Sequence, residues 1–130
     1  MKQSTSIVWL FVFAAIGVAY AQAPSSDPKP DQAAIVEAVG CLSQTGADWI
    51  LANATDAVVA RTPFTTPEAV KAATEKALGT QRYRLLGTTP FSPDRHKGHK
   101  MVVRGLLIKS GSETRINVTS FQMLAETCAK

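Results

Sequence analysis

The chain has 130 residues, a formal net charge of +4 and 45% hydrophobic residues. This length corresponds to a single domain, which excludes a multidomain architecture, and the charge excess is mild. No internal repeat is present, so repeat arrays are excluded as well.

The first residues have the pattern of a secretory signal. Lys2 is followed by an uncharged, mostly apolar run from Ile7 to Tyr20 and then by small residues. This run is about 14 residues long, shorter than the ~20 that a membrane span needs. We predict a signal peptide over residues 1–21, cleavage before Gln22, and a secreted or periplasmic protein. The competing cleavage frame would leave Pro24 first, and proline fits poorly at a scissile bond.

Cys41 and Cys128 are the two cysteines of the chain. An even count in an exported chain of this size predicts a disulfide between them. The bond would close most of the domain into one loop, and loop entropy then contributes about 4 to 5 kcal/mol of stability. A redox-active role is disfavoured because the chain has no C-x-x-C pair.

The region after the signal divides into a leader and one domain. Residues 22–34 are rich in Pro, Ser and Asp, which predicts a disordered or extended leader, and residues 35–130 are expected to form the domain. Alternating and β-rich segments recur along it, separated by turn sequences. Five strands are predicted, over residues 34–43, 49–54, 82–87, 99–109 and 114–124.

The sequence also predicts the roles of several individual residues in these strands. Arg82 and Arg84 should share one face of the third strand, opposite its apolar residues. Gly105 in the middle of the fourth strand indicates a bulge or bend. Ser120 should interrupt the alternation of the last strand, and Trp49 should line the core.

Residues 65–79 have the features of a short helix. Thr65 or Thr66 can cap its start, Pro67 lies in the first turn, and Gly79 should end it. The apolar stripe is thin, so we expect a surface helix rather than a core element.

This set of elements predicts a mainly β (α+β) class, compatible with a small closed barrel. The segments GCLSQTGADWILANA, YRLLG, HKGHKMVVRGLL and INVTSFQMLAETC resemble small secreted bacterial domains of unknown function with an OB-like β-barrel. The resemblance covers residues 36–128. It implies a five-stranded OB-like barrel with residues 55–80 as a helical insertion, while PFSPDRHKG fills the usual helix position as a short turn.

Positive charge is concentrated between residues 82 and 109, where seven Lys or Arg accompany the single acid Asp94. A basic face can meet phosphates, acidic glycans or lipid headgroups, and the alternative is a solvated surface with no ligand. The predicted anion-binding set is Arg82, Arg84, Arg95, Lys97 and Lys100.

Both histidines lie in the stretch FSPDRHKGHKMVVRG. His96 and His99 are the candidates for metal ligands, together with Asp94, because zinc accepts imidazole and carboxylate. A helical pair would need i,i+4 spacing, and Gly98 breaks any helix between them. We therefore expect no bound metal and no cofactor, and an exposed polar connector in which His96 is solvated and His99 hydrogen-bonds a loop carbonyl.

Catalysis and nucleic-acid binding are both disfavoured. The chain lacks G-x-S-x-G, H-E-x-x-H and a glycine-rich phosphate loop, and it is poor in aromatic residues for base stacking. We expect a non-enzymatic exported binding or structural domain that contacts an anionic envelope or extracellular partner. The alternatives are a small-ligand or oligosaccharide-binding barrel and, less favoured, a weak hydrolase. A cleft with convergent polar groups would favour small-ligand binding, and a flat basic face would favour the anionic partner.

Overall fold

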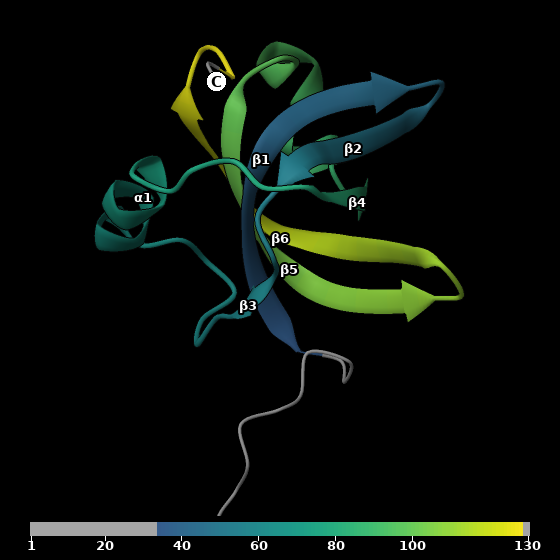
Figure 1. Cartoon of the computed structure of the whole chain (residues 1–130), viewed down its shortest axis with the longest axis horizontal. Coiled ribbons are helices and arrows are strands. Elements are labelled where there is room, and N and C mark those ends of the chain that lie inside the picture. Colours follow the sequence, from purple (N-terminus) through teal and green to yellow (C-terminus); the bar gives the residue numbers. More distant parts are fainter. Residues whose placement is uncertain (1–33, 129–130) are drawn as a thin grey trace, which may run out of the picture.

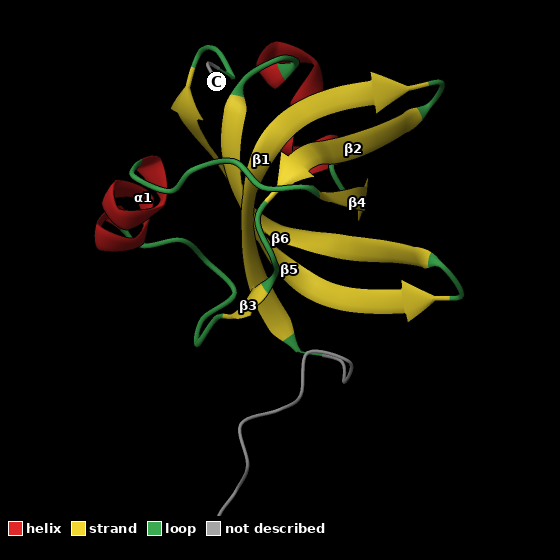
Figure 2. Ribbon diagram, in the orientation of Figure 1, coloured by secondary structure: helices red, strands yellow, loops and turns green. Residues whose placement is uncertain are grey.

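The computed structural model describes residues 34–128, which form a mixed six-stranded sheet with one α-helix outside it (Figure 1). The mainly β class predicted from the sequence is confirmed (Figure 2). The predicted signal peptide and nearly all of the predicted leader lie outside the described residues. The strands are β1 Ile35–Thr45, β2 Asp48–Ala54, β3 Val58–Val59, β4 Gln81–Leu86, β5 Lys100–Ser110 and β6 Glu113–Ala125.

The strands close into a ring of hydrogen bonds, which we call the strand ring. Neighbouring strands follow the order β2-β4-β6-β5-β1-β3, and an additional pairing of β2 with β1 closes the ring. Only β4 and β6 pair in parallel. The two-residue strand β3, which the sequence analysis missed, pairs with β1 outside the ring. Five long strands therefore account for the ring, as predicted.

Two hairpins, β1–β2 and β5–β6, set much of the register. Thr45 pairs with Asp48 and Ser110 with Glu113, so each hairpin has a two-residue loop. The first loop residue is a glycine with positive φ in both cases, 62° and 61°. A type II′ turn requires this conformation at that position, and it matches the twist of the flanking strands.

β1 is buried without interruption from Val36 to Leu42 because both of its faces are covered. One face joins the main core inside the strand ring. The other packs through Val39 against Val102 of β5 and Ala73 of the helix, forming a second, smaller core. Coverage on both faces explains why apolar residues occupy both sides of this strand instead of alternating with polar ones, with Glu37 as the one charged residue of the buried run.

The helix, α1, spans Pro67–Thr74 and is shorter than predicted. Thr66 caps its start, since the threonine hydroxyl accepts from the amide of Ala69 at 3.2 Å. Ala73 is its one buried residue, so the expectation of a surface helix is confirmed. Gly79 does not end the helix. It lies so close to the backbone of Ala54 that a Cβ atom would collide with the Ala54 carbonyl.

The strand irregularity predicted near Gly105 and Ser120 is present, but the extra residue is Thr119. Arg104 pairs with Ser120 and Gly105 with Val118, so Thr119 is left without a partner. A bulge changes the direction in which the neighbouring side chains point. Here the hydroxyl of Thr119 donates to the carbonyl of Pro63, and Ser120 contacts Thr65 of the segment before α1.

A buried ion pair holds the same segment from the β5 side. Glu37 and Arg104 have side chains 9% and 11% exposed, and their carboxylate oxygen and guanidinium nitrogen are 2.7 Å apart. Arg104 also donates to the carbonyls of Thr62 and Phe64 at 3.2 and 2.8 Å. Residues 61–66 are therefore attached to the sheet by charged and neutral hydrogen bonds rather than by apolar packing.

The predicted disulfide is present. Cys41 and Cys128 are bonded across a sequence separation of 87, with Cα atoms 5.9 Å apart. Ala34, assigned to the leader from sequence, is buried, and its carbonyl accepts from the amide of Leu107 at 3.0 Å. It belongs to the folded domain. None of the helices within residues 34–128 is long and apolar enough to cross a membrane.

Candidate functional site

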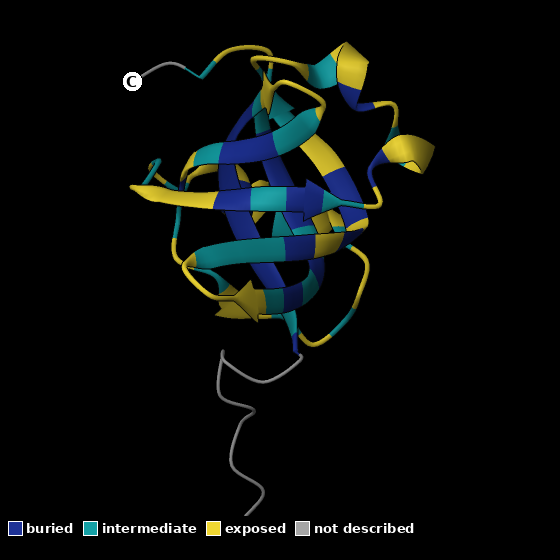
Figure 3. Cartoon of the chain, turned by 90° about the vertical axis from the view of Figure 1, so that its right-hand side faces the viewer, coloured by how far each residue is buried: buried dark blue, intermediate teal, exposed yellow. Residues whose placement is uncertain are grey.

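A cleft of about 500 Å³ lies between the two hairpins, and we call it the hairpin cleft. Both hairpins project to the same side of the molecule (Figure 1), and Figure 3 views this side, where exposed residues gather at the turns and buried ones in mid-strand. Strand β4 and the residue before it line the cleft between the hairpins. The lining residues are Thr45, Asp48, Ile50, Thr80, Gln81, Arg82, Arg84, Ser112, Glu113 and Thr114.

Arg84 links the two hairpins across the cleft. Its guanidinium lies 2.7 Å from the carboxylate of Asp48 at the start of β2 and 3.6 Å from that of Glu113 at the start of β6. Arg115 completes the chain by pairing with Glu113 at 2.6 Å. We call these four side chains the cleft ion chain. It joins the hairpin tips, which lie far apart in the sequence, and so holds the width of the cleft.

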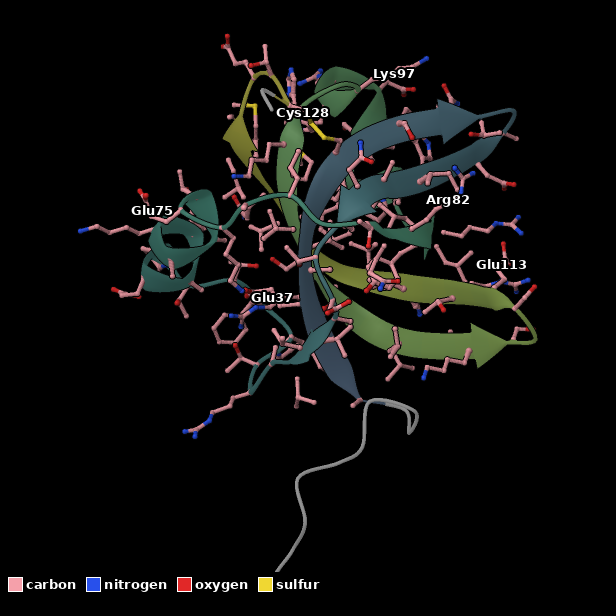
Figure 4. The ribbon with its side chains drawn as sticks, in the orientation of Figure 1. Glu37, Glu75, Arg82, Lys97, Glu113 and Cys128 are labelled. Atoms are coloured by element: carbon pink, nitrogen blue, oxygen red, sulfur yellow. A yellow bond between two sulfur atoms is a disulfide. The ribbon has the colours of Figure 1, made fainter. Side chains whose placement is uncertain are left out.

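Arg82 lines the same cleft but is exposed and has no ion pair with any residue between 34 and 128. Alternation along β4 explains its position, because Tyr83 and Leu85 are buried in the core while the two arginines face outward. The prediction that the two arginines lie on the face opposite the apolar residues of this strand is confirmed. Figure 4 shows Arg82 and Glu113 on the same side of the molecule. Arg82 is thus a cation within the cleft that is free to meet an anion.

A second hollow of about 230 Å³ adjoins the hairpin cleft. The two share Gln81 and Thr114 in their linings, so they lie side by side, and we call the pair of hollows the groove. At its base the Tyr83 hydroxyl donates to the carbonyl of Thr55 at 3.0 Å and accepts from the amide of Ala57 at 2.9 Å. Burial raises the pKa of Tyr83 above its usual value, so this hydroxyl stays protonated.

The carboxylates of the cleft are arranged as charged hydrogen-bond acceptors. Hydrogen bonding from Arg115 and the nearby charges of Arg115 and Arg84 hold the pKa of Glu113 below its usual value. A glycoside hydrolase needs the opposite, one carboxyl whose pKa is raised so that it can donate a proton. Asp48 is also paired with Arg84. Both carboxylates of the cleft are therefore held by arginines.

The other members of the predicted anion-binding set lie elsewhere. Lys100, at the start of β5, donates to the carbonyls of Thr74 and Lys76 at 3.1 and 2.7 Å, so it secures the residues after α1. Arg95 and Lys97 are exposed in and beside the short 3₁₀ helix η2, Pro93–His96. Figure 4 shows Lys97 well apart from Arg82. The five residues do not form one face.

The connector between β4 and β5 includes the segment PFSPDRHKG, residues 90–98, and it contains two short 3₁₀ helices, η1 Thr89–Phe91 and η2, and no α-helix. The expectation that His96 is solvated is wrong, and the bond of His99 to a loop carbonyl comes from its backbone amide, which donates to the His96 carbonyl at 2.9 Å. His96 is half-buried, with its ring against buried Phe121 at 5.7 Å between centroids. The Nδ1 atoms of His96 and His99 are 3.4 Å apart.

Asp48 and Glu113 are site residues that were not predicted from the sequence. Each lies beside a hairpin turn, where an acidic residue is common for local reasons and carries no functional signal. They could have been predicted only from the knowledge that both hairpins lie next to the strand that carries Arg84. This arrangement depends on the parallel pairing of β4 with β6, which no local pattern encodes.

Within residues 34–128 no group of three or more His, Cys, Asp or Glu side chains is arranged to hold a metal ion. No protein-family model matches the chain, and no curated protein sequence matches it.

Proposed function

We propose that this chain is an exported, non-enzymatic binding domain that takes an acidic oligosaccharide in the hairpin cleft. The observation that carries the proposal is the unpaired Arg82 within a cleft that is also lined by hydroxyl, amide and carboxylate groups, by Ile50 and by the paired Arg84. The volume of about 500 Å³ lies within the range of small-molecule sites.

The lining groups suit a sugar that carries negative charge. Hydroxyl and amide side chains can both donate to and accept from sugar hydroxyls, and the two carboxylates can accept from them. Arg82 can pair with a uronate or sulfate group, and a guanidinium forms charge-assisted hydrogen bonds with either. Lys109 in the adjoining hollow is a second exposed cation, so a ligand longer than one sugar could meet positive charge at two points.

We also propose that the strand ring is an OB-like barrel with α1 as an insertion. The support is that β1, β2, β4, β6 and β5 neighbour one another in that cyclic order, with one parallel pair. OB barrels bind oligonucleotides and oligosaccharides on the face of the second and third strands, between the loops that correspond to the two hairpin turns here. The hairpin cleft lies at that face. It has no aromatic lining residue for base stacking, which disfavours a nucleic acid.

Export is supported by the amino-terminal signal pattern and by the disulfide, since disulfides persist in oxidising compartments. A second candidate function is contact with an anionic surface through Arg95 and Lys97, which are both exposed in one connector. It is the weaker of the two proposals because Arg84 and Lys100, which were predicted for the same basic face, are bound by other groups of the same chain.

Isothermal titration with hyaluronan and heparin-derived hexasaccharides at physiological salt tests the proposal, with maltohexaose as the neutral control. Arg82→Gln should weaken binding of the acidic sugar about tenfold or more, because a charged hydrogen bond contributes about 1.5 to 3 kcal/mol. Lys97→Gln removes the same charge outside the cleft and should change affinity less than about twofold.

Two results would overturn the cleft assignment. One is loss of binding in Lys97→Gln and Arg95→Gln with Arg82→Gln unaffected, which would favour the anionic-surface function. The other is the absence of binding to either acidic hexasaccharide.

A further inference from the structure

The segment from His96 to His99 is a type II turn. Lys97 has φ −60° and ψ 126°, and Gly98 has φ 84°. These values match the second and third positions of that turn type. The amide of His99 donates to the carbonyl of His96 at 2.9 Å, which closes the turn. Gly98, which excludes a helical pairing of the histidines, is the residue that this turn requires.

The turn brings the two imidazoles together at its ends. Their Nδ1 atoms are 3.4 Å apart and their ring planes are inclined by 70°. This separation is longer than the ~2.7–3.2 Å of a good N–H hydrogen bond. It matches the ~3.3–3.4 Å between two nitrogens that bind one tetrahedral zinc ion at about 2.0–2.1 Å each.

The His96 imidazole and the backbone of the turn are held in place by their surroundings. The His96 ring packs edge-on against Phe121, which is itself 8% exposed and lies 5.9 Å from Phe91. The turn is fastened to β1 on both sides of the glycine, since Gly98 donates to the carbonyl of Leu42 at 2.8 Å and the His99 carbonyl accepts from the Leu42 amide at 3.0 Å. Little reorganisation is needed for the two nitrogens to share an ion.

We propose that His96 and His99 form a two-imidazole chelate for a zinc ion through their Nδ1 atoms, with water in the remaining positions. Imidazole suits zinc, and Nδ1 is one of the two nitrogens through which histidine binds metals. The exposed cations Arg95 and Lys97 flank the turn and oppose a bound cation. The site is independent of the hairpin cleft, so it stands whether or not the cleft binds a sugar.

Zinc titration of the secreted, oxidised chain by calorimetry tests the proposal, with long-range proton–nitrogen NMR spectra of the imidazoles as a second readout. Zinc should bind with one-to-one stoichiometry and shift Nδ1 of both histidines. His96→Gln or His99→Gln should each weaken binding about tenfold or more, because even outer-shell changes cost metal sites ten- to hundredfold.

Gly98→Ala tests the geometry with both imidazoles still present. Alanine at φ 84° is strained even though a Cβ atom there meets nothing within 4 Å, so the turn should distort and zinc affinity should fall. Gly111→Ala is the matched control, since Gly111 also has positive φ and open space but lies in the β5–β6 turn. Its zinc affinity should equal that of the parent chain.

The proposal is overturned by zinc affinity that is unchanged when either histidine is replaced. It is also overturned if millimolar zinc leaves both imidazoles unshifted, or shifts them through Nε2. The NMR readout uses the parent chain, so it decides the matter even where a variant fails to fold.

Discussion

Residues 34–128 contain two ion clusters in different surroundings, one around Glu37 with Arg104 and Lys76, and the other the cleft ion chain. Glu37 and Arg104 are about one-tenth exposed, whereas the members of the cleft ion chain are one-third or more exposed. The buried pair attaches residues 61–66 to the sheet. The exposed chain spans the hairpin cleft. Burial therefore separates a cluster that maintains the fold from one that is available to a ligand.

The physical reason lies in the cost of desolvation. Removing one partner of a buried pair leaves an uncompensated charge in a poorly solvated site, whereas water replaces the lost partner of an exposed pair. Side chains of the cleft ion chain can exchange an internal partner for a ligand group at little cost. Arg104 cannot do so without loosening the segment that it holds.

The largest expected effect comes from the disulfide, which lies outside both clusters. Replacing Cys41 and Cys128 with Ser should lower the free energy of unfolding by about 4 to 5 kcal/mol, because the unfolded chain loses a long closed loop. Denaturant unfolding measures this. An unchanged midpoint would show that the cross-link does not stabilise the domain.

Breaking the buried cluster should have the next largest effect. Glu37→Leu leaves Arg104 buried without its carboxylate and should cost about 3 to 5 kcal/mol in unfolding free energy. The double variant Glu37→Leu with Arg104→Met should recover much of this loss, since two apolar side chains can replace a buried pair. The double variant should nevertheless release residues 61–66, which hydrogen exchange of their amides would detect. If Glu37→Leu were as stable as the parent, the buried cluster would not contribute more to stability than the exposed one.

Tyr83 lies between the core and the groove and should give an intermediate effect. Tyr83→Phe leaves the amide of Ala57 and the carbonyl of Thr55 without their hydroxyl partner, at a cost of about 1 to 3 kcal/mol. Because the pKa of Tyr83 is raised in the folded protein, its contribution is present below the usual tyrosine value and is lost as pH rises through the raised value. The stability difference between parent and Phe variant should therefore shrink above about pH 10. Thermal melts at pH 7 and pH 11 provide the measurement.

Breaking the exposed cluster should have the smallest effect on stability. Asp48→Asn removes one partner of Arg84 and should change the unfolding free energy by at most about 1 kcal/mol, because both side chains contact solvent. A loss as large as that for Glu37→Leu would contradict the comparison.

The pH dependence of Glu113 should sharpen the comparison further. Its pKa is lowered in the folded protein, so its contribution is present above the usual glutamate value and is lost as pH falls through the lowered value. Melting temperatures of the parent and Glu113→Gln should thus differ slightly at neutral pH and converge below about pH 4. High salt should reduce the difference at neutral pH, because exposed charges are screened.

The strand pattern was predictable in detail, and the site was predictable only in pieces. Each of the five predicted strands matches an observed one, because alternation and turn glycines are local signals. Lys100 was grouped with the anion-binding residues, yet its ammonium group is bound by carbonyls that follow α1. The histidines were judged by helical spacing, and the turn that pairs them depends on Gly98. The sequence shows which side chains are charged, but it does not show which groups they contact in the folded protein.

The sequence by itself determined the mainly β class, the turns that separate the strands, the orientation of the β4 arginines away from the core and the disulfide. The class and the arginine orientation follow from the alternation of apolar and polar residues, the turns from their glycines, and the disulfide from the even number of cysteines. These signals are either local in the sequence or depend on composition alone. The tertiary structure alone decided the hairpin cleft, the cleft ion chain and the burial of Glu37 with Arg104. Each brings together groups from distant parts of the chain, and their distances exist only after β4 pairs in parallel with β6 and closes the strand ring.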